Sequence, residues 1–386
     1  MRLLALQPEG MVIPFIHASM VKAFRSLGVE VLDLPFPQGE EDLPALKSAA
    51  GIEPAAVFTV DLPPWKNKNQ SIKSIQSALG NFWIIWFVDD PEGYAFPESC
   101  DPARTIVFCW DREIVKALCG SQSWKGIPPI YLPLAADPEV FYPGNEGLPP
   151  SFPGGVFVGS TAHSNPFLDG AIGNSPGFEE DVSRLWALWE KDLGRDPRGL
   201  AWEFLRNKTG IDGADLQSDT MARLWVHSAV YGLGRRKRME VVARVIGEGG
   251  GLFGDHGWGS TMARSYRGEI AYGEELRRLY SRSAFALDVR PPQSRTGLTQ
   301  RIFDAGACEI PVLADFSPEL ESLFDAGQEV FFFRTLEEAE GLGRSIRCDL
   351  LGSHAVGKRA GKRILASHTY RHRAQEILGV LHRFLA

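Results

Sequence analysis

Short apolar runs alternate with amphipathic helical patterns along most of this chain, and no other feature limits its fold as strongly. Runs of this kind are typical of buried strands, and the segments between them are long enough to form helices. Parallel strands need such helical crossovers, so the alternation predicts βαβ units with helices on both faces of a parallel sheet. The strands predicted in the first part are RLLALQ (2–7), VEVLDLP (29–35), AAVFTV (55–60), FWIIWFV (82–88), TIVFCW (105–110) and IPPIYLPLA (127–135).

The alternation stops at a segment rich in proline and glycine, which we interpret as a linker over 144–155. This position predicts an N-terminal Rossmann-like domain over 1–143 and a second α/β domain over 156–350. A helical pattern at about 176–232 reads as an insertion in the second domain, and helices over 351–386 end the chain. The strands predicted after the linker are VFVGS (156–160), GGLFG (250–254), FALDV (285–289), PVLAD (311–315) and EVFFF (329–333).

Composition narrows the function classes. The formal net charge of -7 argues against a nucleic-acid-binding protein, because such proteins usually present a basic face to phosphates. The five cysteines lie far apart without a CxxC pair, which disfavours disulfides and structural zinc. The N-terminal apolar run is too short for a secretory signal, and no run approaches the ~20 apolar residues of a membrane span. We therefore expect a cytoplasmic protein without a transmembrane segment.

The first candidate binding site follows the predicted strand FALDV, in the stretch RTGLTQRIFDAGA. Ligands of open α/β sheets bind beyond the carboxyl ends of strands, where free backbone N–H groups and a helix dipole favour phosphate. Gly297 would let the backbone approach a phosphate, and Thr299 would cap the helix or donate to the ligand. Asp304 would accept the hydroxyls of a ribose. The alternative is a packing helix in which Asp304 is solvated or paired with Arg301.

The segment that contains this stretch, from Tyr280 to Phe333, resembles the donor domain of the CgeB-like glycosyltransferases. In that family a strand leads into an Arg-x-Phe-Glu/Asp-Ala helix, which RIFDA matches here with Arg301 and Asp304. The resemblance implies the GT-B architecture, in which two Rossmann-like domains face each other across a cleft and the last helices cross back to the first domain. Further segments that resemble the family are YLPLAADPEVFYP (131–143), VFVGS (156–160) and SHTYRHRAQEIL (367–378).

The resemblance also implies other residues that bind the nucleotide-sugar. Gly159 ends the strand that opens the donor domain, and the loop GDHGWG takes the position that reads the nucleotide. In that loop His256 and Trp258 are the groups able to hydrogen-bond or stack. The alternative for the loop is a tight turn with Trp258 packed inward.

A basic run, GRRKRME, precedes the predicted helix MEVVARVI (239–246). We expect Arg235, Arg236 and Lys237 to lie where this helix begins. There they would stabilise the charge of a diphosphate leaving group without a metal ion. The alternative is a solvated helix face.

The N-terminal domain supplies the candidates for a catalytic base. Asp89, Asp90 and Glu92 follow a buried strand, where one of them could take the proton of an acceptor hydroxyl. His17 is the other candidate, although a single histidine early in a helix is more often a cap or a core residue.

The sequence therefore predicts a metal-independent, hexosyltransferase-like glycosyltransferase. It would transfer a sugar from a nucleotide-sugar to a glycan, a protein or a small molecule, with no further cofactor and no nucleic-acid partner. Related retaining enzymes carry two acids in the donor segment, and here only the second position, Asp304, is acidic. That departure leaves two alternatives open, which are an inactive nucleotide- or sugar-binding protein and a nucleotide-sugar epimerase of the same architecture.

Overall fold

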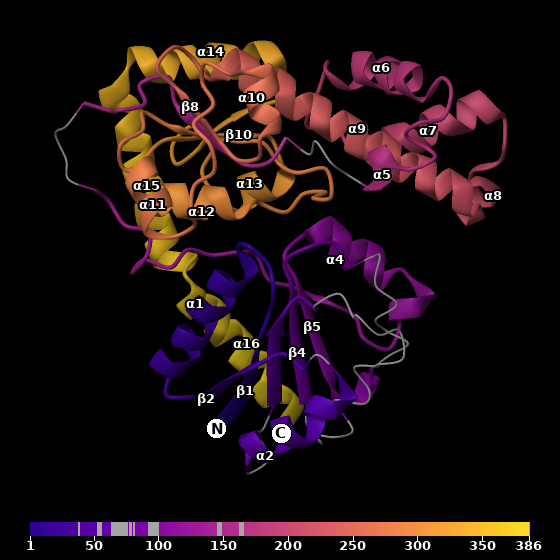
Figure 1. The fold of residues 1–386 in the computed structure, drawn as a ribbon, viewed down its shortest axis with the longest axis vertical. Coiled ribbons are helices and arrows are strands. Elements are labelled where there is room, and N and C mark those ends of the chain that lie inside the picture. Colours follow the sequence, from indigo (N-terminus) through magenta and orange to yellow (C-terminus); the bar gives the residue numbers. More distant parts are fainter. Residues whose placement is uncertain are drawn as a thin grey trace. The chain divides into compact units, whose positions relative to one another are not determined.

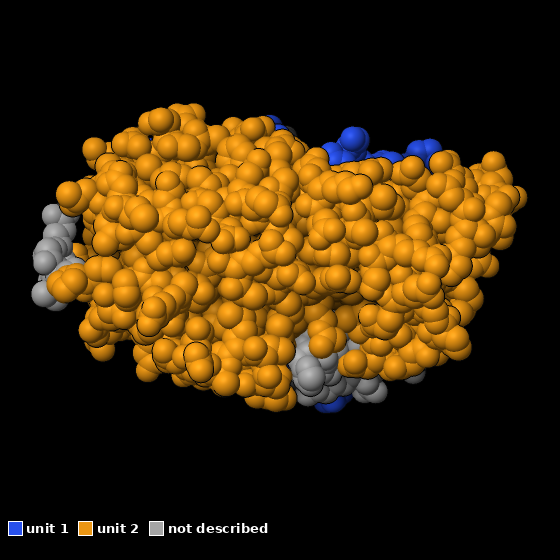
Figure 2. All heavy atoms as spheres, turned by 90° about the horizontal axis from the view of Figure 1, so that it is seen from above, with its two compact units in different colours: residues 1–137, 296–298, 365–386 blue, residues 138–295, 299–364 orange. Residues whose placement is uncertain are grey.

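A computed structural model describes residues 1–37, 39–51, 56–62, 76, 79, 82–91, 100–144, 149–161 and 166–385. Its contacts divide the chain into two compact units, which Figure 2 colours separately. Unit 1 comprises Met1–Asp137, Thr296–Leu298 and Leu365–Ala386. Unit 2 comprises Pro138–Arg295 and Thr299–Ile364.

These bounds differ from the predicted domain bounds at 143 and 350. The predicted linker over 144–155 falls in unit 2. One reason is that Phe152 pairs with this unit: its N–H donates to the carbonyl of Arg282 (3.2 Å), and its own carbonyl accepts from Ala284 (3.2 Å). Residues 149–155 of this segment therefore pack on unit 2 through an isolated bridge between Phe152 and Ser283.

Unit 1 is built on a parallel sheet with the strand order β2-β1-β3-β4-β5-β6. Every position of β3 and β5 is buried, which explains why they read as unbroken apolar runs. The predicted strand at 127–135 shrinks to two residues, because Pro128, Pro129 and Pro133 have no N–H to donate. The strands are β1 (Arg2–Gln7), β2 (Glu30–Pro35), β3 (Ala56–Val60), β4 (Phe82–Phe87), β5 (Thr105–Cys109) and β6 (Ile130–Tyr131).

The described helices of unit 1 come from both ends of the chain. The C-terminal helix α16 packs against α1, as Figure 1 shows in yellow and indigo. Buried Arg373 of α16 donates to the carbonyls of Pro133 (2.7 Å) and Leu134 (3.1 Å). The helices are α1 (Ile13–Ser26), α2 (Leu43–Ala50), α4 (Arg112–Cys119) and α16 (Tyr370–Leu385), with short turns η1 (Glu40–Asp42), η4 (Pro102–Arg104) and η5 (Gln122–Trp124).

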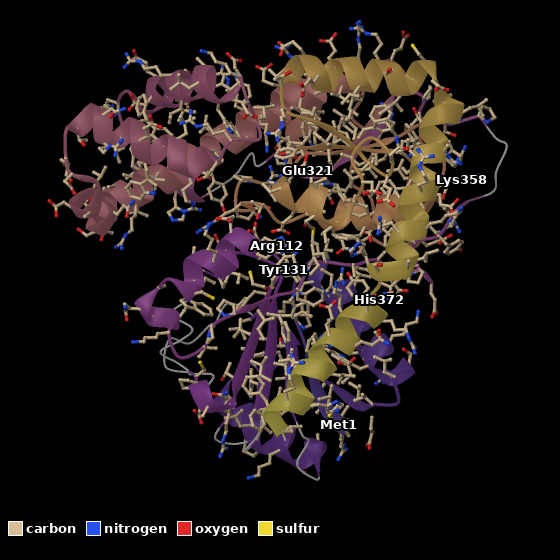
Figure 3. All side chains as sticks on the ribbon, turned by 180° about the vertical axis from the view of Figure 1, so that it is seen from behind. Met1, Arg112, Tyr131, Glu321, Lys358 and His372 are labelled. Atoms are coloured by element: carbon tan, nitrogen blue, oxygen red, sulfur yellow. The ribbon has the colours of Figure 1, made fainter. Side chains whose placement is uncertain are left out.

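The start of α4 is fixed to the last strand of the same sheet. The guanidinium of Arg112 lies 4.2 Å from the centre of the Tyr131 ring, and Figure 3 labels both residues. Asp111, the residue before α4, accepts from the N–H groups of Glu113 (3.0 Å) and Ile114 (3.1 Å) and so caps the helix.

Unit 2 contains a second parallel sheet, with the strand order β11-β10-β9-β7-β8. The strands are β7 (Val156–Val158), β8 (Gly251–Phe253), β9 (Ala286–Asp288), β10 (Val312–Asp315) and β11 (Phe331–Phe333). The helices near this sheet are α10 (Gly257–Thr261), α11 (Glu274–Tyr280), α12 (Gln300–Ala307), α13 (Pro318–Leu323), α14 (Leu336–Cys348) and α15 (Leu350–Ser367). The prediction of two parallel-sheet units is confirmed.

A helical segment interrupts unit 2 between β7 and β8, as predicted. Its helices are α5 (Pro166–Asp169), α6 (Phe178–Trp189), α7 (Pro197–Thr209), α8 (Gly213–Ser218) and α9 (Thr220–Val245). The apolar stripe predicted on α6 is buried and shares one hydrophobic cluster with the strands of the sheet. Among the residues described, none of the helices is both long and apolar enough to cross a bilayer.

Helix α9 corrects one prediction. It continues without a break through Gly232 and Gly234, so the basic run lies inside a helix and does not precede one. Packing explains why position 234 is glycine, because a Cβ there would lie 2.6 Å from the Cβ of Pro292. Glycine here permits close contact with a neighbouring loop and does not end the helix.

Candidate functional site

The carboxyl ends of the unit 2 strands bring together most of the predicted donor-side residues. β9 and β10 end in Asp288 and Asp315, which are both 1% exposed. A buried carboxylate is costly unless cations and hydrogen-bond donors surround it. Basic side chains from α9, from the loop after β9 and from α12 supply those partners here.

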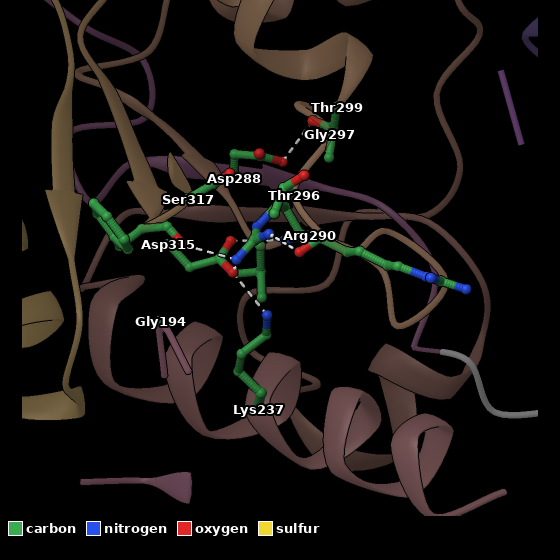
Figure 4. Close-up of polar contacts among 12 residues, drawn as sticks. Gly194, Lys237, Asp288, Arg290, Thr296, Gly297, Thr299, Asp315 and Ser317 are labelled. Atoms are coloured by element: carbon green, nitrogen blue, oxygen red, sulfur yellow. Dashed lines mark hydrogen bonds and ion pairs between the residues drawn. The ribbon is translucent and has the colours of Figure 1, made fainter. Parts of the chain in front are cut away.

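Asp315 is held by two cations. Its Oδ2 lies 2.7 Å from Lys237 Nζ and 3.2 Å from Arg290 Nε, and its Oδ1 accepts from the backbone N–H of Arg290 (2.8 Å; Figure 4). Burial raises the pKa of Asp315, but the charges of Lys237 and Arg290 outweigh it and hold that pKa below its usual value. Burial lowers the pKa of Lys237, and Asp315 opposes that change.

Arg290 also fixes the loop that follows β9. Its guanidinium donates to the carbonyl of Arg295 at one end of the loop (2.8 Å) and to the carbonyl of Phe316 after β10 (2.6 Å). The exits of two neighbouring strands are therefore held by one side chain.

Asp288 forms a second cluster with the start of α12. Its Oδ1 accepts from Arg301 Nε (2.7 Å) and from the Thr299 hydroxyl (2.8 Å). Within the described part of the chain, its buried Oδ2 has no hydrogen-bond partner. Thr299 occupies the N-cap position of α12 but does not cap the helix, because its hydroxyl is directed to Asp288.

Two arginines hold the ends of β7 and β9 together. Arg301 donates to the carbonyls of Val158 (2.9 Å) and Val289 (3.1 Å). Arg238 donates to the carbonyls of Ser160 (2.7 Å) and Val289 (3.3 Å). Burial, and then the nearby charge of Arg301, lower the pKa of Arg238 to about 10.

The turn after β7 is fixed from the neighbouring strand. Asp255, which follows β8, accepts from the N–H (2.7 Å) and the hydroxyl (2.7 Å) of Thr161. Trp258 donates from Nε1 to the carbonyl of Gly159 (2.7 Å). A Cβ at Gly159 would lie 2.9 Å from the guanidinium of Arg301, so this position favours glycine.

The strand ends of unit 1 carry acidic residues. Asp61 directly follows β3 and accepts through Oδ1 from the N–H groups of Val88 (2.8 Å) and Asp89 (3.4 Å), which follow β4. The exposed side chain of Asp89 accepts from the N–H of Asp90 (2.9 Å). Asp61 is not among the residues predicted from the sequence, and its signal there is an acid placed directly after a buried strand.

Comparisons with known proteins agree with this architecture. Residues 227–379 match the model of a family described as glycosyl transferase-like. No curated protein matches the chain. A solved alpha-glucosyltransferase in complex with UDP is similar, with a TM-score of 0.54, 10% identity and 99% of each chain covered. A glycosyltransferase from Rickettsia africae ESF-5 has a TM-score of 0.51 and 10% identity, with 100% of this chain and 98% of that chain covered.

A sucrose-phosphate synthase from Thermosynechococcus elongatus is similar too, with a TM-score of 0.50, 15% identity, and 100% of this chain and 99% of that chain covered. The fold is GT-B. In this GT-B chain, the segment that matches the family model begins inside α9 and ends inside α16. It therefore contains Lys237, Asp288, Arg290 and Asp315.

Within the GT-B fold, the predicted donor residues separate into exposed and buried groups. His256 and Arg235 are exposed and able to meet a ligand. Arg236 is half-buried, with its guanidinium 5.3 Å from the Trp186 ring. Lys237 does not lie on a solvated helix face, since it is buried against Asp315. Trp258 is 0% exposed and packs on Phe157, so the inward-packed alternative is correct for its ring.

The sequence predicts free backbone N–H groups around Gly297, but the N–H groups at this position are already bonded. Thr296 and Gly297 belong to unit 1, where their N–H groups donate to Oδ2 of Asp111 (2.8 and 2.7 Å). The carboxylate that caps α4 therefore takes the place predicted for a phosphate. The predicted contact of Gly297 with a nucleotide-sugar stays a prediction.

Asp304 is buried on α12 and does not pair with Arg301. Its Oδ2 accepts from the Tyr272 hydroxyl (2.7 Å), and its Oδ1 accepts from Gln300 Nε2 (2.7 Å). Its role in ribose binding stays a prediction, but the structure shows that this carboxylate accepts a hydroxyl.

The catalytic bases predicted in unit 1 differ in how deeply their side chains are buried. His17 is buried, with Nε2 2.9 Å from Asp33 Oδ1, and burial lowers its pKa against the opposing effect of Asp33. It stacks on Phe58, which fits the alternative of a core residue. Asp89 is exposed and Asp90 is half-buried, while Glu92 lies outside the described residues. No metal-binding group of three His, Cys, Asp or Glu side chains occurs among the residues whose placement is described.

Proposed function

We propose that the protein is a CgeB-like glycosyltransferase that moves a hexose from a nucleotide-diphosphate-sugar to an acceptor hydroxyl. The observation that carries the proposal is the charge at the carboxyl edge of the unit 2 sheet. Lys237, Arg238, Arg290 and Arg301 gather there around Asp255, Asp288 and Asp315. These four cations would offset the charge of a diphosphate.

The start of α12 supports the same ligand. Thr299 leaves the helix N-terminus without a side-chain cap, and N-terminal backbone N–H groups with the helix dipole favour an anion. We propose that the diphosphate binds between this helix start and the turn at Gly159, with Arg301 beside both. His256 and Arg235 are exposed and would contact the nucleotide from α10 and α9.

The ribose contact is proposed for Asp304. In this structure Asp304 Oδ2 accepts a hydroxyl from Tyr272, and a ribose hydroxyl would replace that donor with the same chemistry. UDP is the first nucleotide to test, because a similar fold is solved in complex with it.

Unit 1 is proposed to bind the acceptor, which would be a glycan, a protein or a small molecule. Transfer is proposed to need no metal ion and no cofactor beyond the nucleotide-sugar, because Arg and Lys side chains would balance the charge of the leaving diphosphate. We propose a cytoplasmic location for this reaction.

Thermal unfolding with UDP, GDP, ADP and dTDP tests the nucleotide site. A ligand at about 100 times its dissociation constant stabilises a protein by roughly 2.7 kcal/mol, which is a readily measured shift. Arg235→Ala and His256→Ala should reduce the shift, because both side chains are exposed at the proposed site.

Arg223→Ala, on the same helix as Arg235, and His382→Ala are matched exposed controls and should change nothing. Release of the nucleoside diphosphate from a panel of nucleotide-sugars then separates an enzyme from a binding protein. If no nucleotide shifts the unfolding temperature, the proposed donor site is wrong.

A further inference from the structure

Asp61 has an unusual environment at the end of β3. It is 5% exposed, and its backbone φ of 52° lies in the left-handed region that few residues other than glycine, asparagine and aspartate adopt. Oδ1 accepts both N–H groups that follow β4, from Val88 (2.8 Å) and Asp89 (3.4 Å). Oδ2 is buried and, among the described residues, has no hydrogen-bond partner.

A purely structural role explains Oδ1 of this carboxylate but not Oδ2. The contact with β4 needs one acceptor oxygen, which asparagine would provide without burying a charge and with equal tolerance of a left-handed backbone. A buried carboxylate is costly when no cation balances it, and the second oxygen is left unused. That buried oxygen can accept a proton or a hydroxyl hydrogen bond that the described residues do not supply.

Among the residues whose placement is described, the charged and titratable groups around Asp61 do not neutralise it. Asp89 approaches from the end of β4, and the buried Cys109 thiol lies on β5, with its pKa raised by burial. On α1, which packs on β3, His17 is buried with a lowered pKa and interacts with Asp33. Burial raises the pKa of Asp61 to about 7, although the Val88 N–H opposes that change. A group that titrates near neutral pH suits proton transfer.

We propose that Asp61 is the catalytic base of unit 1, with Oδ2 binding the hydroxyl of the acceptor and taking up its proton. This inference rests on the proposed function. The acceptor oxygen forms a bond to the anomeric carbon, the bond from that carbon to the diphosphate oxygen breaks, and its electron pair leaves with the diphosphate. The hydroxyl proton passes to Oδ2 of Asp61 and from there to solvent.

This assignment differs from the bases predicted from the sequence. Asp89 is exposed, and its Oδ1 accepts from Asp90. His17 already interacts with Asp33 through Nε2. Asp61 is buried, its Oδ2 has no hydrogen-bond partner among the described residues, and it lies at the carboxyl edge of a parallel sheet, where ligands of α/β sheets bind.

Asp61→Asn is the direct test, because asparagine retains the acceptor for both N–H groups and accepts the same backbone. The probe is the nucleotide-sugar that the natural protein hydrolyses fastest among UDP-glucose, UDP-N-acetylglucosamine, UDP-galactose, GDP-mannose and dTDP-glucose. With water as the acceptor, we expect hydrolysis to fall at least about 100-fold in this variant. The rate of the natural protein should rise with pH through about 7, and the variant should lose that rise.

Controls separate this inference from the proposed function. The shift in unfolding temperature caused by UDP should be the same in the variant and the natural protein, because the nucleotide contacts are proposed in unit 2. Asp101→Asn, at the half-buried cap of η4 in the same unit, should keep the natural rate and pH profile. Should Asp61→Asn fail to fold, Asp61→Gly takes its place, since glycine also accepts the backbone.

A variant that hydrolyses the probe at the natural rate with an unchanged pH profile would overturn the role of Asp61 and leave the proposed function standing. A natural protein that binds UDP but hydrolyses none of the five sugars would overturn both catalytic proposals while retaining the nucleotide site.

Discussion

Lys237 and Asp315 form a buried ion pair with Nζ 2.7 Å from Oδ2, although 78 positions separate them in the chain. The pair joins the middle of α9 to the end of β10, and Arg290 approaches the same carboxylate oxygen (3.2 Å). The basic run on α9 therefore contributes one cation to the interior of unit 2 and leaves another, Arg235, on the surface. Neighbouring basic residues in this run have different tasks.

Replacing Lys237 should destabilise the protein strongly. Lys237→Met removes one of two cations that balance Asp315, and breaking a buried pair costs about 3 kcal/mol or more. Arg184→Gln, which breaks the exposed pair of Arg184 with Glu180, should cost less than about 1 kcal/mol. Urea unfolding of both variants gives the comparison, and equal effects would show that the buried pair has no special weight.

Gly159→Ala should disturb the nucleotide site. The new methyl group would lie 2.9 Å from the guanidinium of Arg301 and 3.1 Å from the Phe157 ring, so Arg301 would have to move away from Asp288. We expect a loss of about 1–3 kcal/mol in stability together with weaker UDP binding. Gly341→Ala on α14 meets nothing within 4 Å and should instead stabilise by about 0.5–1 kcal/mol. Calorimetry on both variants decides whether the position at Gly159 is special.

Asp304 and its partner Tyr272 should give different results when each is changed. Asp304→Asn should lower UDP affinity about tenfold, which corresponds to about 1.4 kcal/mol. Tyr272→Phe should instead raise that affinity about fivefold or more, because the ribose hydroxyl would no longer have to displace the tyrosine hydroxyl. Without UDP, Tyr272→Phe should cost about 1–3 kcal/mol in stability, since Oδ2 of Asp304 loses its donor. Equal UDP affinity in all three proteins would leave Asp304 with a structural role alone.

Asp61 should make stability depend on pH. Its folded pKa of about 7 lies above the ordinary value of 3.8, so the folded state binds a proton more tightly than the unfolded state. The stability that this group contributes is therefore full below about pH 4 and is lost as pH rises through 7, by at most roughly 4 kcal/mol. Asp61→Asn should be more stable than the natural protein at pH 8 and should lose that advantage at pH 4. Parallel pH dependence of the two unfolding curves would contradict the raised pKa.

The strands and the apolar stripe of α6 could be predicted because buried positions are occupied by apolar residues at a regular spacing in the local sequence. Phe178, Val182 and Trp186 recur at helical spacing, and all three are buried. The local pattern of apolar and polar residues does not indicate contacts between residues that are far apart in the sequence. Nothing near Gly297 indicates that its N–H donates to Asp111, which lies 186 positions away.

Other differences between the predictions and the structure come from residues whose local sequence fits two different structural roles. The predicted helical insertion ended near 232 and the next predicted helix began at 239, yet one helix runs through both, and Gly234 on it packs against Pro292. The ring of Trp258 could face a ligand or the core, and its partner Gly159 is 99 positions distant. Asp61 was passed over because its two N–H donors follow another strand, 27 and 28 positions further along the chain.

Helix α9 spans 26 residues, or about 39 Å at the rise of an α-helix. Its first half packs with α7 and α8, and its second half carries Lys237 and Arg238 to the strand ends (Figure 1). Because α9 is one continuous helix, and because its buried side chains share a hydrophobic cluster with the strands, the helical segment belongs to the body that holds the charged strand ends and is not a separate appendage.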